Sequence, residues 1–167
     1  MSEVPDLGLL ASAAQRDGIE QLVLGVVVRH DDKVLLLRRP AVGDAVEGEW
    51  EIPTGAVDPG DNLHLALTHL VRDSTCLYPG SVPQVLAQLD YPAHERLLVF
   101  AVDVEVSEPI ELIDHDAYTW TSLVAETPLV TETTSTVLAI YGRLHGIHAR
   151  QRRGYHPPRH DPDTCGP

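Results

Sequence analysis

The sequence contains little of three things that would each indicate a particular class of protein: cysteine, long apolar runs and basic residues. Its 167 residues include only two cysteines, Cys76 and Cys165. Two cysteines so far apart do not form the framework of a disulfide-rich secreted domain, so reduced thiols in the cytoplasm are expected. No stretch approaches the ~18 apolar residues of a membrane span. The first residues, MSEVPD, lack the basic lead and apolar run of a signal peptide, and no membrane association is expected.

The shortage of basic residues limits the possible partners. Lysine and arginine number 12 against 25 acidic residues, which gives a formal net charge of −13. Residues 149–167 carry four arginines and two aspartates, so this segment is at +2 and the rest of the chain is at −15. So acidic a chain repels a phosphate backbone, and nucleic acid is not an expected partner. A small phosphorylated ligand remains possible if a divalent cation bridges it, although the charge could also serve only to keep the surface soluble.

Apolar and turn-forming residues alternate along the chain in a way that predicts a mixed α/β fold. A short helix is expected over residues 5–16, and a second one is indicated where Leu63, Leu67, Leu70 and Val71 follow a helical period after Asn62, a plausible N-cap. Strands are predicted at 22–29, 34–39, 50–53, 82–91, 95–106 and 117–122, with a closing helix from about 132 to 148. This order favours one layered domain over 21–148, preceded by an N-terminal segment (1–20). Residues 149–167, rich in Pro, Arg and His, are predicted to be disordered.

The segment 48–77, GEWEIPTGAVDPGDNLHLALTHLVRDSTCL, resembles the Nudix hydrolases. In that family a glycine, a first acid, an arginine followed by glutamate, and a Glu-Glu pair occur at fixed spacing. Trp50 and Pro53 also resemble the family's lead-in to the box, and Trp120 matches a tryptophan often found in a late strand. The resemblance implies the Nudix fold, a mixed β-sheet layered between helices, over roughly residues 22–148. The matching positions here, in the order of the box, are Gly55, Asp61, His69, Leu70, Asp73, Ser74, Cys76 and Leu77.

The resemblance also implies a chemistry, hydrolysis of a phosphoanhydride in a nucleoside diphosphate-linked or related substrate. Family members use Mg²⁺ or Mn²⁺ to neutralise phosphate oxygens and activate water, and helix carboxylates one turn apart hold the ions. At those positions this chain has Leu70, Asp73 and Ser74, so only Asp73 keeps a carboxylate. Loss of a charge-stabilising group typically costs ~3–4 kcal/mol of transition-state stabilisation, so family-type catalysis from this box alone is disfavoured. Leu70 also extends the apolar stripe, which predicts that this edge of the helix is buried.

Other parts of the motif suggest substitutes for what is missing. Asp61 and His69 occupy the positions of an ion pair that braces the family's loop against its helix, and His69 could pair with Asp73 instead. A histidine without a role is an equal alternative. Glu51 is a candidate metal ligand and catalytic acid beside Asp73. The expected substrate contacts are Arg38, Arg39, Trp50 and Glu51, and the acids that could reach the box are Glu105, Glu108, Glu111, Asp114 and Asp116.

Two weaker signals remain near the end of the chain and in the box. His145 and His148, with His156, His160 and Cys165, could bind zinc, but no fixed geometry supports them. Cys76 could be a nucleophile, but no activating base accompanies it, and a small buried side chain is the stronger expectation.

Three functions therefore stay open: a divergent hydrolase using Mg²⁺ or Mn²⁺, an inactive ligand-binding or interaction protein that needs no metal, and another reaction on the same scaffold. A homodimer is possible.

Overall fold

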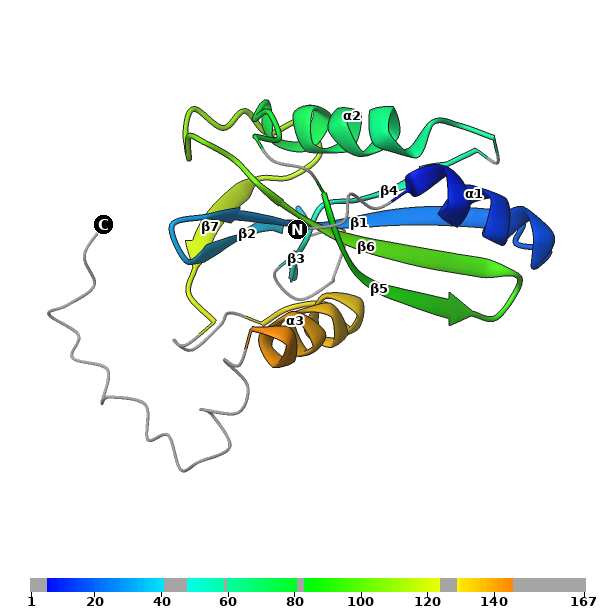
Figure 1. The fold of residues 1–167 in the computed structure, drawn as a ribbon. Helices are drawn as coiled ribbons and strands as arrows, with labels where there is room; N and C mark the ends of the chain where they lie inside the picture. The colour runs from blue at the N-terminus through cyan, green and yellow to red at the C-terminus, as the bar shows by residue number, and fades with distance from the viewer. Residues whose placement is uncertain (1–5, 41–47, 59, 81–82, 124–128, 146–167) are drawn as a thin grey trace, which may run out of the picture.

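The computed structural model describes residues 6–40, 48–58, 60–80, 83–123 and 129–145. The segment predicted to be disordered, 149–167, lies outside them. One mixed sheet forms the centre, with helices α1 and α2 over one face and α3 over the other (Figure 1). This arrangement confirms the predicted mixed sheet layered between helices. No helix in the described ranges is long and apolar enough to cross a membrane.

The elements follow the predicted order, with one strand added. The helices are α1 (Leu7–Arg16), α2 (Leu63–Thr75) and α3 (Glu132–Leu144). The strands are β1 (Gln21–His30), β2 (Lys33–Arg38), β3 (Trp50–Glu51), β4 (Thr54–Val57), β5 (Gln84–Tyr91), β6 (Glu95–Asp103) and β7 (Ala117–Thr121). The added strand is β4, in a stretch expected to be a turn; it pairs antiparallel with β1, with Leu24 opposite Gly55.

Strand β1 is the centre of the sheet. The order is β3-β2-β1-β6-β5, with β4 pairing with β1 and β7 pairing with β2. The β1–β6 pair is parallel, from Gln21 opposite Glu95 to Arg29 opposite Asp103, whereas the other strand pairs are antiparallel. Because both faces of β1 are covered, Val26 and Val28 pack towards α2 while Val27 packs on the α3 side. Burial on both faces explains why the apolar residues of β1 follow one another without polar residues between them.

Helix α2 carries the motif segment, and its ends are set by local residues. Asn62 caps the start, with its Oδ1 atom accepting from the Leu65 backbone N–H at 3.1 Å. The helix ends at Cys76, whose φ of 64° is left-handed and whose N–H donates to the Arg72 carbonyl. The family's glycine at this position would adopt that conformation without the steric cost that a cysteine side chain brings. Leu63, Leu67 and Val71 are buried against the sheet.

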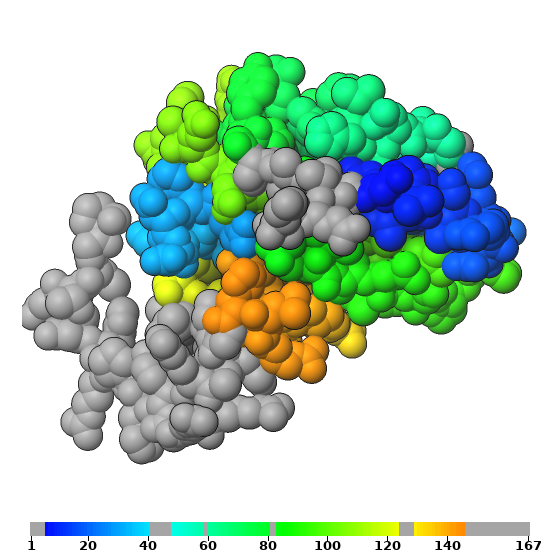
Figure 2. All heavy atoms as spheres, in the orientation of Figure 1, coloured from blue at the N-terminus to red at the C-terminus, as the bar shows by residue number. Residues whose placement is uncertain are grey.

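Helix α1 is tied to the far end of the β5–β6 hairpin by one guanidinium group. Arg96 is 4 % exposed and donates to Asp90 at 2.7 Å and to Asp17, which caps the end of α1, at 2.9 Å. The hydrogen bond from Arg96 lowers the pKa of the Asp90 carboxyl, and the same contact raises the pKa of Arg96. Leu7 and Ala14 of α1 join the core cluster of α2. Figure 2 shows the two helices side by side at the surface.

Candidate functional site

The edge of α2 that would face metal ions is packed against strand β4. A Cβ atom placed on Gly55 would lie 3.0 Å from Cδ1 of Leu70, so the leucine side chain covers the glycine closely. Leu70 is partly buried and packs on the core cluster shared by α1 and α2. The predicted burial of this edge is therefore met in part: Leu70 is partly buried, whereas His69 and Asp73 beside it are exposed. An apolar side chain now fills the place of a family glutamate.

The remaining polar side chains of the motif do not meet at a common site. Asp73 and His69 are exposed on α2, and Ser74 is half-buried. Asp61 accepts from the Asp58 backbone N–H at 3.1 Å, a contact within its own loop. Among the residues described by the structure, no ion pair or hydrogen bond joins His69 to Asp61 or Asp73. The bracing pair suggested by the sequence is absent from this arrangement.

The side chains present do not fit the family's metal centre. Nudix hydrolases generally use divalent metals such as Mg²⁺ or Mn²⁺. Those ions require several oxygen ligands around one point. In the described ranges, no group of three or more His, Cys, Asp or Glu side chains is placed to hold a metal. With Leu70 packed on Gly55, Asp73 is the carboxylate that α2 retains at the metal positions.

Glu51 is the buried acid of the site, and it already has two partners. Its side chain is 9 % exposed, and its Oε1 atom accepts from Nε of Arg39 at 2.7 Å. Nε2 of His115 lies 2.9 Å from the same oxygen. Sequence reasoning missed His115, which sits among the acidic residues after β6, 64 positions from Glu51. The one hint in the sequence was a histidine within an acidic stretch, and no regular spacing connects that histidine to the motif.

Arg38, Arg39, Trp50 and Glu51, the predicted substrate contacts, do come together, because β2 and β3 pair there with Arg38 opposite Trp50. The Arg38 guanidinium lies 5.6 Å from the centre of the Trp50 ring, and its Nε donates to Asp116 at 2.8 Å. Asp116 therefore neutralises an arginine and does not extend a metal site.

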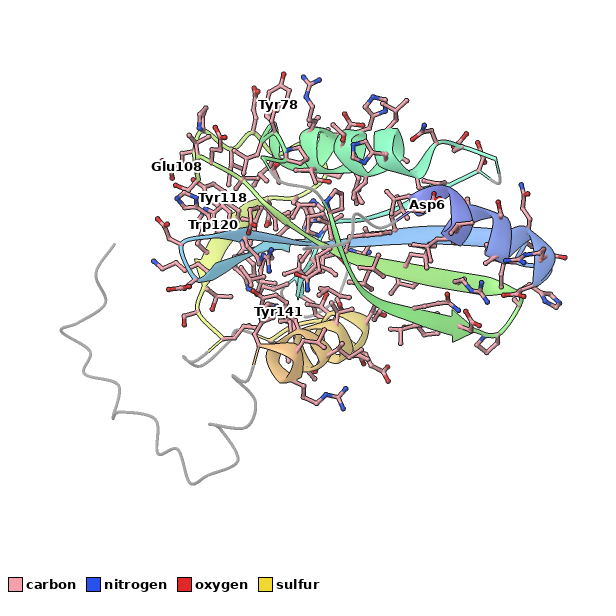
Figure 3. All side chains as sticks on the ribbon, in the orientation of Figure 1. Asp6, Tyr78, Glu108, Tyr118, Trp120 and Tyr141 are labelled. Carbon is pink, nitrogen blue, oxygen red and sulfur yellow. The ribbon has the colours of Figure 1, made fainter. Side chains whose placement is uncertain are left out.

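The other acids after β6 lie around the end of α2 and the outer strand β7. Figure 3 shows Glu108 and Tyr118 together on this side of the molecule, where the Tyr118 hydroxyl donates to Glu108 at 2.8 Å. This hydrogen bond raises the pKa of Tyr118. Glu111 reaches the motif, since its Oε2 atom lies 3.7 Å from the Cys76 thiol. Cys76 is an exposed free thiol, so the expectation of a buried side chain was wrong: the helix ends there in a left-handed conformation, and the next residue, Leu77, is the one that is buried.

A cavity of about 530 Å³ opens beside Glu51 and Arg39. We call it the Thr134 cavity. Its floor includes Val23 and Leu97, and its far wall is the start of α3. The Thr134 hydroxyl accepts from the Ile52 backbone N–H at 3.1 Å, which fixes this helix end against the strand that carries Glu51. The other lining residues are Thr54, Tyr91, Pro92, Glu95, Thr131 and Thr133.

The possible zinc ligands are placed only in part. His145 follows α3, and its ring lies 4.3 Å from that of Tyr141. His148, His156, His160 and Cys165 lie outside the described residues.

Comparison with known proteins decides the family. The model of the NUDIX domain matches residues 20–135, more than two thirds of the chain. The chain belongs to the NUDIX family. The search of the curated proteins gave no match.

Solved structures support the same fold for this NUDIX protein. A NUDIX hydrolase from Nitrosomonas europaea superposes with a TM-score of 0.63 at 14 % identity, covering 76 % of this chain and 73 % of the other. The E. coli ORF135 protein gives a TM-score of 0.60 at 21 % identity, with 81 % and 94 % covered. A MutT NUDIX hydrolase from Burkholderia pseudomallei gives 0.56 at 19 % identity, with 71 % and 95 % covered. At these identities the similarity shows the fold alone.

Proposed function

We propose that this protein is a divergent Nudix-type hydrolase that binds a nucleoside diphosphate-linked or related phosphoanhydride in the Thr134 cavity. The observation that carries the proposal is the position of Arg39 and Glu51, which both line this cavity of about 530 Å³. That volume suits a small ligand, and its apolar floor with a few polar side chains is typical of ligand sites. The formal net charge of −13 over the whole chain favours a small ligand over nucleic acid.

Arg39 is the proposed phosphate contact. Glu51 engages its Nε atom, and the side chain is 63 % exposed. In the described part of the chain the two terminal NH₂ groups have no other recorded partner, so they can donate to phosphate oxygens. The ion pair with Glu51 holds the guanidinium plane in one orientation, which lowers the entropy lost on binding.

Glu51 is the proposed general base. Both of its recorded contacts use Oε1, which leaves Oε2 to accept the proton of an attacking water. The water oxygen then bonds to phosphorus while the anhydride P–O bond breaks, and Arg39 stabilises the charge on the phosphate oxygens. His115 positions Glu51 through Oε1. The described side chains offer no complete set of metal ligands, so we expect turnover to be slow for this fold.

A specific contact favours a second function, ligand binding without turnover. Leu70 packs on Gly55 where the family places a metal-binding glutamate, which removes a charge and closes part of the metal site. A protein with this change could keep the Thr134 cavity as a sensor or interaction module. Cytoplasmic location and a homodimer remain predictions from the sequence.

One set of assays separates the two functions. A panel of nucleoside diphosphate compounds is tested for phosphate or mononucleotide release with Mg²⁺, with Mn²⁺ and with EDTA, and for thermal stabilisation at matched concentrations. Hydrolysis predicts release that Glu51→Gln lowers by about 10²–10⁴-fold while binding persists. Pure binding predicts stabilisation without release in any metal.

Variants then locate the site. Arg39→Ala should weaken binding about tenfold or more, because a charge-assisted hydrogen bond is lost, whereas Arg143→Ala on the end of α3 is the matched control and should bind normally. Asp73→Ala decides whether the motif helix takes part: Asp73 does not line the Thr134 cavity, so the proposed mechanism expects unchanged activity, and a loss of activity would place the chemistry at the motif helix instead. Equal binding by Arg39→Ala and the wild type would refute the Thr134 cavity as the site.

A further inference from the structure

A second cavity, of about 540 Å³, lies at the end of α2. We call it the Tyr78 cavity. It shares no lining residue with the Thr134 cavity. Its walls include Cys76, Tyr78, Glu105, Val106, Ile110 and Glu111.

Backbone contacts fix the walls of the Tyr78 cavity. The Gly80 N–H donates to the Asp103 carbonyl at 2.7 Å, and Pro79 forms a bridge with Val104. On the other side, the Glu111 N–H donates to the Thr75 carbonyl at 3.1 Å, which joins the segment after β6 to the last turn of α2. The cavity is therefore formed without a ligand, and binding loses little conformational entropy in ordering its walls.

The cavity exposes large apolar side chains to solvent. Tyr78 is 63 % exposed and Val106 is 57 % exposed. The Arg72 guanidinium stacks on the Tyr78 ring at 4.3 Å and holds it in place at the outer edge, where Figure 3 shows Tyr78 beyond the end of α2. Exposed aromatic and aliphatic groups around a preformed hollow favour a ligand with an apolar body.

Two acidic side chains of the cavity indicate which charge the polar part of the ligand carries. Within the described residues, Glu105 makes no recorded hydrogen bond or ion pair, and the Glu111 carboxylate is approached by the Cys76 thiol alone. Other acids of the same segment do have strong partners, since Glu108 accepts from Tyr118 and Asp116 from Arg38. Neither carboxylate is paired with a cation among the described residues, since Arg72 is engaged with the Tyr78 ring at the outer edge, so beside apolar walls the two acids attract an ammonium group and repel a phosphate.

We propose that the Tyr78 cavity binds a small organic cation, an amine carried on an apolar body. Its ammonium group lies between Glu105 and Glu111, and its apolar part contacts Val106 and Ile110. The Tyr78 ring, held by Arg72, adds apolar contact at the outer edge. This site is independent of the proposed hydrolase site and takes a ligand of opposite charge.

Cys76 provides a reporter inside the cavity. In the full chain carrying Cys165→Ser, alkylation of Cys76 by iodoacetamide is followed by mass spectrometry. The probes are phenethylamine, its neutral analogue phenethyl alcohol, and the anion phenylacetate. We expect phenethylamine to slow alkylation at about fivefold lower concentration than the alcohol, because an ion pair with exposed carboxylates adds only a modest attraction, and we expect phenylacetate to have no effect.

Variants test the assigned carboxylates. Glu105→Gln with Glu111→Gln should remove the preference for the amine while the alcohol still protects. Asp114→Asn removes one charge from the same segment outside the cavity and should keep the preference. Protection by neither compound would overturn the proposal. So would equal protection by amine and alcohol in the parent chain, or a preference that survives the double variant. Chemical shifts of backbone amides near Val106, measured on the same samples, show whether each variant is folded and whether the probe contacts this cavity.

Discussion

The packing of Leu70 on Gly55 can be tested by a double-mutant cycle. A Cβ atom on Gly55 would lie 3.0 Å from the leucine Cδ1, against an optimum of about 3.5–4.0 Å between carbons. Overpacking of this kind typically costs about 1–3 kcal/mol. Gly55 lies in a strand, and replacing it by alanine recovers about 0.4–1 kcal/mol from the lower entropy of the unfolded chain. Gly55→Ala should thus lower the free energy of unfolding by roughly 0.5–2 kcal/mol.

Leu70→Ala should itself be destabilising by about 1–2 kcal/mol, below the range for a fully buried leucine, because the side chain is partly buried. In the double variant the alanine Cβ on residue 55 enters the space left by the leucine. The loss of stability should then be smaller than the sum of the two single losses by at least about 0.5 kcal/mol.

The assay is urea unfolding followed by far-UV circular dichroism on the four proteins of the cycle. Leu65→Ala is the matched control, since Leu65 lies on α2 and is 56 % exposed; it should change stability little and add independently to Gly55→Ala. Additivity of Gly55→Ala and Leu70→Ala within about 0.3–0.5 kcal/mol would refute the contact. It would also remove the reason for treating this edge of the metal site as closed.

Three further predictions concern contacts outside that edge. Asp90→Asn should make the free energy of unfolding depend less steeply on pH in acid. The pKa of Asp90 is lowered in the folded state, so its carboxylate stabilises the fold above the unfolded pKa of about 3.9, and this stabilisation is lost as pH falls through the folded pKa. Unfolding midpoints between about pH 5 and 2 measure this. Glu108→Gln should lower the raised pKa of Tyr118, so a titration of tyrosinate absorbance should begin at lower pH; an unchanged curve would contradict the hydrogen bond. Thr131→Ala should destabilise the protein by about 1 kcal/mol in thermal melts, since the Thr131 hydroxyl caps α3.

Local patterns predicted much of the fold because the residues that decide it are close together in the chain. Asn62 and the stripe from Leu63 to Val71 specify α2 by themselves, and the structure places the helix at Leu63–Thr75. Strand β4 was missed because its four residues adjoin Gly- and Pro-rich sequence. These residues form a strand because they pair with β1, and a local sequence pattern does not reveal that pairing.

The candidate site was less predictable for the same reason. Arg39, Trp50 and Glu51 were identified because they flank the motif, and β2–β3 pairing brings them together. His115 comes from a segment without periodicity, and its contact with Glu51 depends on how the chain after β6 returns across the sheet. The Asp61–His69 pair, one of the alternatives that the sequence left open, does not form because Asp61 accepts from a backbone N–H within its own loop.

The parallel pairing of β1 with β6 has a consequence for how the chain folds. Partners such as Arg29 and Asp103 are 74 positions apart, so the chain between them must close a long loop before any of these contacts forms. Helix α2, which covers β1 on one face, lies within that loop, whereas α1 precedes β1 in the chain. Contacts between distant residues slow folding, and a ribosome must release β6 before β1 can be completed. Until then β1, a strand with a continuous apolar run, has an open edge, and this interval of synthesis is when the protein is most exposed to aggregation.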